Sequence, residues 1–205
     1  KILVNEKGVI DLTELEKNLS DYNHKNKHGK KRIKLISFSG ASNVLGTCND
    51  IKKICQLGHK YGAMVHVDAA QLIAHKPIDM KGTGIDFLSF SAHKMYAPFG
   101  SGALVSRKGG LREVIEGGNY PYKSNNSQNI AGIVAMGKAM VLLERIGMDI
   151  VQEYEKGLTI KILSEMTKIP DLKVYGIKSI NNPIIDQRLG VFVIELKGMM
   201  ANEMA

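Results

Sequence analysis

The chain has 205 residues, of which 44% are apolar, and it carries a formal net charge of +8. This length allows one full core, or a core with part of a second domain. No apolar run approaches the ~20 residues of a transmembrane helix and no export signal is recognisable, so we expect a cytoplasmic protein that does not contact a membrane.

The first half predicts alternating helices and strands. The leucines of residues 12–19 have helical spacing, and a basic loop follows, with six charges (Lys25, Lys27, Lys30, Lys31, Arg32 and Lys34). Residues 33–39 read as a buried strand. From Ile51 the apolar positions follow the period of an amphipathic helix, which Gly62 closes. Two further strands are predicted, one over 63–67 that ends at Asp68 and one over 86–90 that ends at Ser91.

This order of elements is typical of an α/β domain with a mainly parallel sheet between helices. Ligands bind to such sheets at the carboxyl ends of the strands. Polar residues directly follow three predicted strand ends, and we expect them at one rim (Asn43, Asp68, Gln71, Ser91, His93 and Lys94).

The second half begins with a Pro-Gly turn at 98–102 and a short strand over 103–106. Residues 129–146 predict a helix that is apolar on most of its circumference, as in a protein interior or an interface. A charged helix over 149–166 and strands near 172–175 and 190–196 follow. We place a domain boundary at Gly147, which divides the chain into 1–147 and 148–205.

Both ends suggest an internal fragment. Lys1 is not an initiating methionine, and residues 200–205 read as the first turn of a continuing helix. Cys48 and Cys55 have neither disulfide-framework nor zinc-knuckle spacing, so we expect packed, reduced thiols and no metal site. Activation of Cys48 near a helix start remains an alternative.

Lys94 and Asp68 are the residues whose positions suggest chemistry. A lysine that forms a Schiff base must lose its proton, which burial promotes, and Lys94 stands between a buried-looking strand and a turn. Pyridoxal phosphate needs an acid at its ring nitrogen, a role that suits Asp68 at a strand tip. On spacing alone, Asp68 could equally be a turn or capping residue.

Two motifs make the sequence recognisable. They are His-Val-Asp-Ala-Ala-Gln from His66, and Ser-Phe-Ser-Ala-His-Lys-Met-Tyr-Ala-Pro-Phe-Gly-Ser-Gly from Ser89. With Ser-Asn-Val-Leu-Gly from Ser42, they closely resemble the class V aminotransferase family, and within it the cysteine desulfurase and selenocysteine lyase branch. The resemblance implies a pyridoxal-phosphate-dependent transferase of fold type I, with an aspartate aminotransferase-like large domain (1–147) and the start of a smaller α+β domain (148–205).

The resemblance also implies roles for single residues. Lys94 matches the lysine that binds the cofactor and shuttles protons, and Asp68 the partner of the pyridine nitrogen. Gln71 matches the residue that binds the phenolic oxygen, and Asn43 one near the substrate. Ser91 and His93 match phosphate contacts.

Some positions depart from the family pattern. Relatives usually carry Gly-Thr-Pro-Asn where this chain has Asn-Ser-Gln-Asn from Asn126. Ser127 keeps a hydroxyl for the phosphate of the neighbouring subunit, but the glycine and proline are lost. Neither cysteine matches the desulfurase nucleophile, which would lie after Ala205.

The sequence therefore predicts an enzyme that acts on an amino acid, with removal of sulfur or selenium favoured over amine transfer or epimerisation. We expect a homodimer, and we expect the fragment alone to be inactive. The rivals are a basic nucleic-acid-binding module and a non-catalytic α/β module. The first is disfavoured because the basic loop contains no aromatic residue on which bases could stack.

Overall fold

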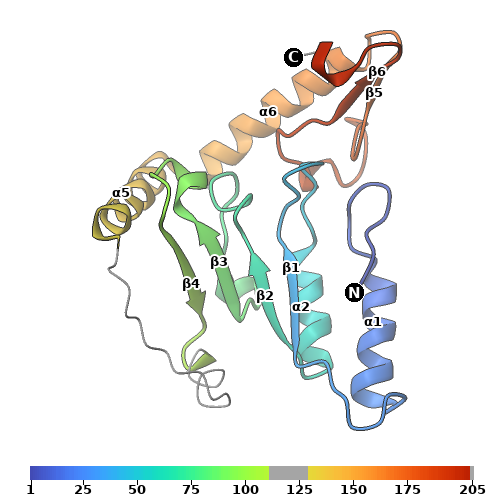
Figure 1. Cartoon of the computed structure of the whole chain (residues 1–205), viewed down its shortest axis with the longest axis vertical. Coiled ribbons are helices and arrows are strands. Elements are labelled where there is room, and N and C mark those ends of the chain that lie inside the picture. The colour runs from blue at the N-terminus through green and yellow to red at the C-terminus, as the bar shows by residue number, and fades with distance from the viewer. Residues whose placement is uncertain (111–128, 204–205) are drawn as a thin grey trace.

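A four-stranded sheet forms the centre of the computed structural model, which describes residues 1–110 and 129–203 (Figure 1). Strands β1 (Leu35–Ser39), β2 (Met64–Asp68) and β3 (Phe87–Ser91) are parallel and adjacent in that order. Strand β4 (Gly102–Ser106) pairs antiparallel with β3. The prediction of a mainly parallel sheet is confirmed, with β4 as its antiparallel edge.

One face of the sheet packs on helix α2 (Ile51–Lys60), which begins at the Asp50 cap. Val65 and Val67 of β2 are fully buried, as is Ile54 of α2. Gly58 allows this close approach, because a Cβ there would lie 2.7 Å from a methyl carbon of Val65. The core thus lies between β2 and α2, and it holds the strand ends in place.

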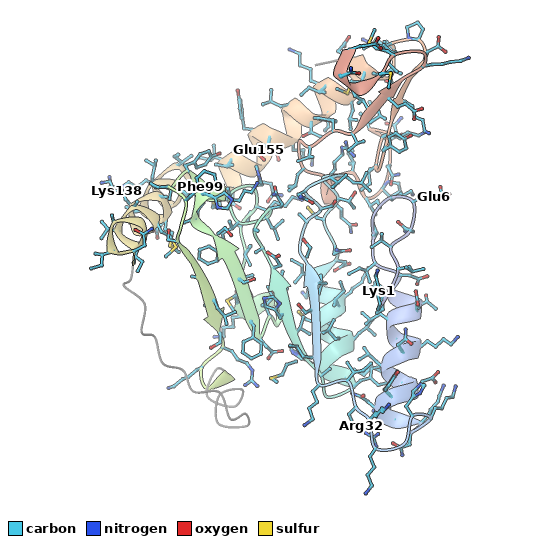
Figure 2. The ribbon with its side chains drawn as sticks, viewed as in Figure 1. Lys1, Glu6, Arg32, Phe99, Lys138 and Glu155 are labelled. Carbon is cyan, nitrogen blue, oxygen red and sulfur yellow. The ribbon has the colours of Figure 1, made fainter. Side chains whose placement is uncertain are left out.

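Helix α1 (Leu12–Leu19) precedes the sheet and is capped by Asp11, whose side chain accepts hydrogen bonds from two backbone N–H groups. A π-helical turn (Ser20–His24) and the basic loop follow. This loop lies at the lower end of the molecule, where Arg32 is labelled, whereas Phe99 lies near the upper end of the sheet (Figure 2). A short helix α3 (Met80–Thr83) lies between β2 and β3.

The remaining elements are helices α5 (Ile130–Ile146) and α6 (Met148–Met166) and an antiparallel pair, β5 (Leu172–Val174) and β6 (Ile194–Leu196). Gly147, with φ of 89°, breaks the helix between α5 and α6. We call residues 148–203 the second unit. The domain boundary at Gly147 stays a prediction, and the helix break is the local feature at that position.

The strand predicted over 190–196 is shorter in the structure. Only Ile194–Leu196 pairs in register with β5, and the chain just before the predicted range is bound to another segment. Arg188 forms a bridge with Thr47, and the backbone N–H of Leu189 donates to the carbonyl of Gly46. The expected helical start at 200–205 is a 3₁₀ turn (Ala201–Glu203), and residues 204–205 lie outside the described part.

Candidate functional site

The carboxyl ends of β1, β2 and β3 form the rim where the predicted site residues lie. Asp68 is the last residue of β2 and pairs in register with Ser39 of β1 and Ser89 of β3. Ser91 is the last residue of β3, and the 3₁₀ helix Ala92–Met95 carries His93 and Lys94 directly after it. The parallel topology thus brings residues from three separate segments to one edge of the sheet.

Asp68 presents an exposed carboxylate at this rim. Its Oδ1 accepts a hydrogen bond of 3.0 Å from the backbone N–H of Ala70. Its backbone carbonyl accepts a bond from the N–H of Gly40, which links the end of β2 to the segment after β1. The carboxylate therefore has a fixed backbone and keeps acceptor capacity for a ligand.

The turn after Asp68 carries Gln71. We call residues 69–76 the Gln71 turn. Its backbone folds back on itself, since the N–H groups of Leu72 and Ile73 both donate to the carbonyl of Ala69. Leu72 and Ala74 are buried in the core and anchor the turn. Gln71 is left half-buried at the rim.

Two buried side chains, Ala92 and Met95, anchor the 3₁₀ helix that carries His93 and Lys94. The backbone N–H of Ala92 also donates to the carbonyl of Ser101. The sequence led us to expect burial around Lys94, but among the described residues its side chain is exposed. The strand before it is buried, whereas the 3₁₀ helix turns Lys94 outward. Any burial of this amine must come from other parts of the complete protein or from a ligand.

His93 stacks on Phe99, with ring centroids 4.6 Å apart and planes 19° apart. Phe99 itself is 79% exposed. The stacking contact keeps the imidazole ring of His93 beside the ring of Phe99. A phosphate contact from His93 would therefore come from a ring whose orientation is already restricted.

Asn43 lies in the loop that follows β1. We call residues 40–48 the Asn43 loop. The hydroxyl of Ser42 accepts hydrogen bonds from the N–H groups of Val44 and Leu45, which closes the loop tightly. Asn43 is exposed at its tip. Ser127, the remaining predicted contact, lies outside the described residues.

Neither cysteine has the character of a nucleophile. Burial raises the pKa of the Cys48 thiol, although the nearby charge of Lys76 opposes this. Burial and the charge of Asp86 raise the pKa of Cys55 to about 12. Thiolates are therefore disfavoured at both positions, which does not support the suggested activation of Cys48. In the described ranges, no three His, Cys, Asp or Glu residues cluster as metal ligands would.

The basic loop is partly neutralised. Lys27 and Lys25 lie 2.9 Å and 3.6 Å from the carboxylate of Asp21, and Arg32 donates to backbone carbonyls and to Asn26. Tyr22 stacks on His28, which occupies one face of the ring that a nucleobase would need. None of these contacts favours a nucleic-acid site. Among the described residues, no helix has the length and apolarity to span a membrane.

Comparison with known proteins decides the family. The sequence profile of the class V aminotransferases matches residues 1–204. The chain belongs to the class V aminotransferase family. Enzymes of this family depend on pyridoxal phosphate, as the motifs at Asp68 and Lys94 predicted.

Class V relatives are similar in both sequence and structure. A cysteine desulfurase of Shigella sonnei is 32% identical over 185 residues, which are 81% of this chain and 44% of that protein. A probable cysteine desulfurase of Borreliella burgdorferi is 36% identical over 190 residues, 80% of this chain and 43% of that protein. The chain thus spans less than half the length of these relatives.

Solved structures agree on the fold. The apo structure of a cysteine desulfurase from Thermococcus onnurineus NA1 covers 100% of this chain and 52% of its own, with a TM-score of 0.80 at 22% identity. A NifS-like protein from Rickettsia africae covers 98% of this chain and 52% of its own, with a TM-score of 0.72 at 26% identity. The predicted fold type I architecture is confirmed.

The rim of the sheet offers a donor set that fits pyridoxal phosphate. Asp68 supplies a carboxylate for a protonated ring nitrogen, and Lys94 supplies an amine for the aldehyde. A hydroxyl and an imidazole, from Ser91 and His93, suit a phosphate. Within residues 1–110 and 129–203, the side chains of Gln71, Ser91 and Lys94 form no hydrogen bond or ion pair, so these groups are available to a ligand. The individual roles remain predictions.

Two residues that connect the rim to the second unit could not be recognised from the sequence. His75 and Arg188 contact segments that lie far away along the chain, and neither belongs to a recognisable motif. The only local signal for His75 is its place four residues after Gln71. Arg188 offers none, because a single arginine before an apolar run is usually a surface residue.

Proposed function

We propose that the complete protein is a pyridoxal-phosphate-dependent enzyme that removes sulfur or selenium from a cysteine-like amino acid. The observation that carries the proposal is the placement of the Asp68 carboxylate and the Lys94 amine after neighbouring parallel strands, on one rim. The curated relatives named cysteine desulfurase support the choice of substrate. Because the chain spans less than half of their length, the reaction concerns the protein as a whole.

Bound pyridoxal phosphate supplies an electron-withdrawing ring that stabilises negative charge at the substrate carbon. Asp68 would hold the proton on the ring nitrogen, because a carboxylate favours the positively charged form of the ring. Gln71 would donate a hydrogen bond to the phenolic oxygen, while Ser91 and His93 would bind the phosphate. Asn43 would orient the substrate.

Lys94 would bind the coenzyme covalently through its Nζ atom. Once substrate has taken its place, the free amine would accept or donate the proton at the substrate Cα. The 3₁₀ helix anchored by Ala92 and Met95 holds the Lys94 backbone beside the end of β3, where such a transfer requires it. Amine transfer and epimerisation use the same groups, and the residues outside this chain decide between the reactions.

We also propose a homodimer and a cytoplasmic location. The apolar side chains that α5 exposes support the dimer (Ile130, Ile133, Val134, Met140, Val141 and Leu142). Ser127 would reach the phosphate of the neighbouring subunit. The two free, buried cysteines are compatible with a reducing compartment.

Borohydride reduction tests the proposal. The complete protein is incubated with pyridoxal phosphate, reduced and digested, and the labelled peptide is identified by mass spectrometry. We expect the label on Lys94, and its loss in Lys94→Ala. Lys108→Ala is the matched control, since this exposed lysine follows β4 at the end of the sheet opposite the rim and its loss should leave the label in place. Labelling at another lysine, or none, contradicts the proposal.

A further inference from the structure

Both loops that carry rim residues are bound to the second unit. The Asn43 loop and the Gln71 turn follow neighbouring strands of the main sheet, and each contacts the segment 185–191 or helix α6. These contacts join residues that are 80 and 143 positions apart along the chain. The second unit is therefore part of the support of the rim.

Arg188 forms the first anchor. Its side chain is 5% exposed, and Nη1 donates to the carbonyl of Leu45 in the Asn43 loop at 3.3 Å and to that of Tyr175 at 3.4 Å. Nη2 donates to the carbonyl of Val191 at 3.0 Å. One guanidinium thus joins the Asn43 loop to two segments of the second unit.

The backbone around Arg188 strengthens this anchor. The N–H of Leu189 donates to the carbonyl of Gly46, and the N–H of Cys48 donates to the carbonyl of Gln187, both at 2.7 Å. Gly46 has φ of 66°, and a Cβ there would lie 2.9 Å from the carbonyl oxygens of Leu189 and Val191. Only glycine allows the two segments to approach this closely.

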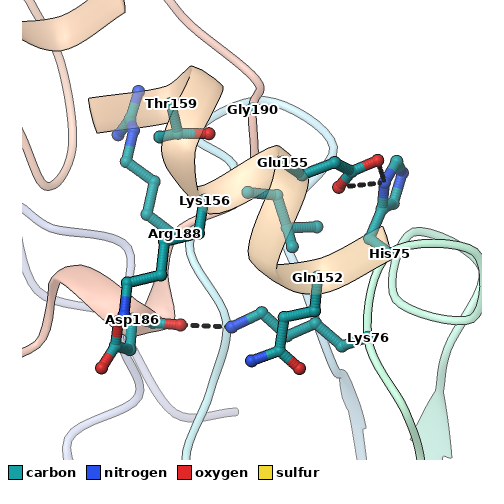
Figure 3. A pocket seen from close by; sticks show the side chains of 10 residues that line it. His75, Lys76, Gln152, Glu155, Lys156, Thr159, Asp186, Arg188 and Gly190 are labelled. Carbon is teal, nitrogen blue, oxygen red and sulfur yellow. Dashed lines mark hydrogen bonds and ion pairs between the residues drawn. The ribbon is translucent and has the colours of Figure 1, made fainter. Parts of the chain in front are cut away.

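His75 forms the second anchor, at the end of the Gln71 turn. Its Nδ1 lies 2.9 Å from both carboxylate oxygens of Glu155 on α6 (Figure 3). The neighbouring Lys76 donates to the backbone carbonyl of Asp186. Asp186 in turn pairs with Lys156 of α6 at 2.8 Å. The Gln71 turn is thus attached both to α6 and to the segment that carries Arg188.

The chemistry of Arg188 is unusual for a residue that only stabilises a fold. No carboxylate among the described residues pairs with it, its Nε has no hydrogen-bond partner, and burial lowers its pKa. A buried cation without a counterion is expensive, and an apolar side chain of similar size would pack there at lower cost. The guanidinium lies 4.9 Å from the centroid of the Phe192 ring, which offsets part of this cost, and unlike an apolar side chain it also fixes several carbonyls in one geometry.

We infer that Arg188 and His75 are positioning residues, which hold Asn43 and Gln71 at the rim through the second unit. The inference rests on the proposed function, because it concerns the contacts of Asn43 and Gln71 with coenzyme and substrate. Arg188 acts through Leu45, two residues after Asn43. His75 acts through the Gln71 turn, four residues after Gln71. Neither residue needs to touch the coenzyme.

The test uses the complete protein with Arg188→Met and Glu155→Ala, and Glu165→Ala as the matched control. Glu165 lies on α6 and also forms an ion pair, with the exposed Lys168, but within the described ranges it forms no hydrogen bond or ion pair with the rim. Amide hydrogen exchange is measured by mass spectrometry without coenzyme. We expect exchange to accelerate about 10-fold or more in the Asn43 loop of Arg188→Met and in the Gln71 turn of Glu155→Ala, because each loses an anchoring contact. Glu165→Ala should behave as the unsubstituted protein.

The affinity for pyridoxal phosphate and the absorption maximum of the bound coenzyme provide the second readout. Glu155→Ala should shift the absorption maximum, since a displaced Gln71 no longer donates to the phenolic oxygen, and Arg188→Met should raise KM more than it lowers kcat. Unchanged exchange in both loops overturns the inference, as do accelerated exchange with unchanged spectrum and KM. If Arg188→Met does not fold, the same measurements on Arg188→Lys and Glu155→Ala decide whether the inference holds. Failure of the proposed function is recognised separately, by the absence of borohydride label on Lys94 in the unsubstituted protein.

Discussion

Asp68 and Ser89 stand side by side in the register of β2 and β3. Neighbours in parallel register present their side chains to the same face of a sheet, and Ser91 shares that face with Ser89 because it is two residues further along the strand. The carboxylate and the proposed phosphate contact therefore lie on one face, directly ahead of the 3₁₀ helix that carries Lys94. A flat, elongated ligand could therefore contact the Asp68 carboxylate of β2 at one of its ends and the Ser91 hydroxyl of β3 at the other.

Replacement of Asp68 tests its proposed contact with the ring nitrogen of the coenzyme. Asp68→Asn keeps the size of the side chain and removes the negative charge that favours a protonated ring nitrogen. We expect turnover by the complete protein to fall by about 10- to 100-fold, the loss that corresponds to one charge-assisted hydrogen bond. Steady-state kinetics measure this effect. Borohydride label on Lys94 should persist, because Asp68 does not form the covalent bond, and unchanged turnover would contradict the proposed role.

Asp86 provides a prediction on stability and pH. Its side chain is 6% exposed and accepts hydrogen bonds from the N–H of Val65, from His59 and from Arg107, at 2.8, 2.8 and 2.7 Å. Burial opposes ionisation, but the hydrogen bonds from His59, Val65 and Arg107 outweigh it and lower the pKa of Asp86. The carboxylate therefore stabilises the fold above the unfolded-state pKa of about 3.9, and this contribution is lost as the pH falls through the lowered folded-state pKa.

We expect Asp86→Asn to lower the free energy of unfolding at pH 7 by about 2 kcal/mol, because buried donors lose a charged acceptor. The difference from the unsubstituted protein should shrink as the pH falls below about 4, because the unfolded-state carboxylate then becomes protonated, and it should level off once the pH has passed the lowered folded-state pKa. Urea unfolding followed by circular dichroism at several pH values measures the stability difference at pH 7 and its change with pH. A difference that stays constant down to the acid range would show that the charge of Asp86 is not the cause.

The cysteines give a prediction on reactivity. Since burial raises the pKa values of Cys48 and Cys55, a disulfide reagent at pH 8 should label neither of them on the timescale of an exposed thiol. Both should react fully in denaturant. Mass spectrometry of the labelled peptides distinguishes them from any cysteine elsewhere in the complete protein. Rapid labelling of Cys48 in the folded protein would reopen its role as a nucleophile.

The rim could be predicted from the sequence because its parts are local. Each strand is a short apolar run, and Asp68 and Ser91 stand where their runs end, so the rule for parallel sheets brings them together. The same rule placed Gln71, His93 and Lys94 just past these strand ends, and the motifs added a role for each of them. The exposure of Lys94 could not be predicted in this way, because burial of a residue after a strand depends on which segments lie over it.

The supports of the rim could not be predicted, because they join distant parts of the chain. The hydrogen bond between Arg188 and Leu45 spans 143 residues, and the one between His75 and Glu155 spans 80. No periodicity or motif records such pairings. The same contacts hold the chain just before the strand predicted over 190–196, since Arg188 and Leu189 bind the Asn43 loop, and the strand that pairs with β5 begins only at Ile194.

Helix α5 provides the last prediction, which concerns assembly. Three of its exposed apolar residues, Ile130, Ile133 and Val134, lie within its first two turns, and its N-terminal cap Asn129 donates to the carbonyl of Gly100, close to Phe99. We expect Val134→Glu to weaken the proposed homodimer by at least about 10-fold in Kd, because a charge would be buried in an apolar contact. Sedimentation at several concentrations measures the equilibrium. The matched control is Lys178→Glu, an exposed change in the second unit, which should leave the dimer intact. If Val134→Glu sediments as the unsubstituted protein does, the exposed face of α5 is not the dimer contact, and another part of the complete protein must cover it.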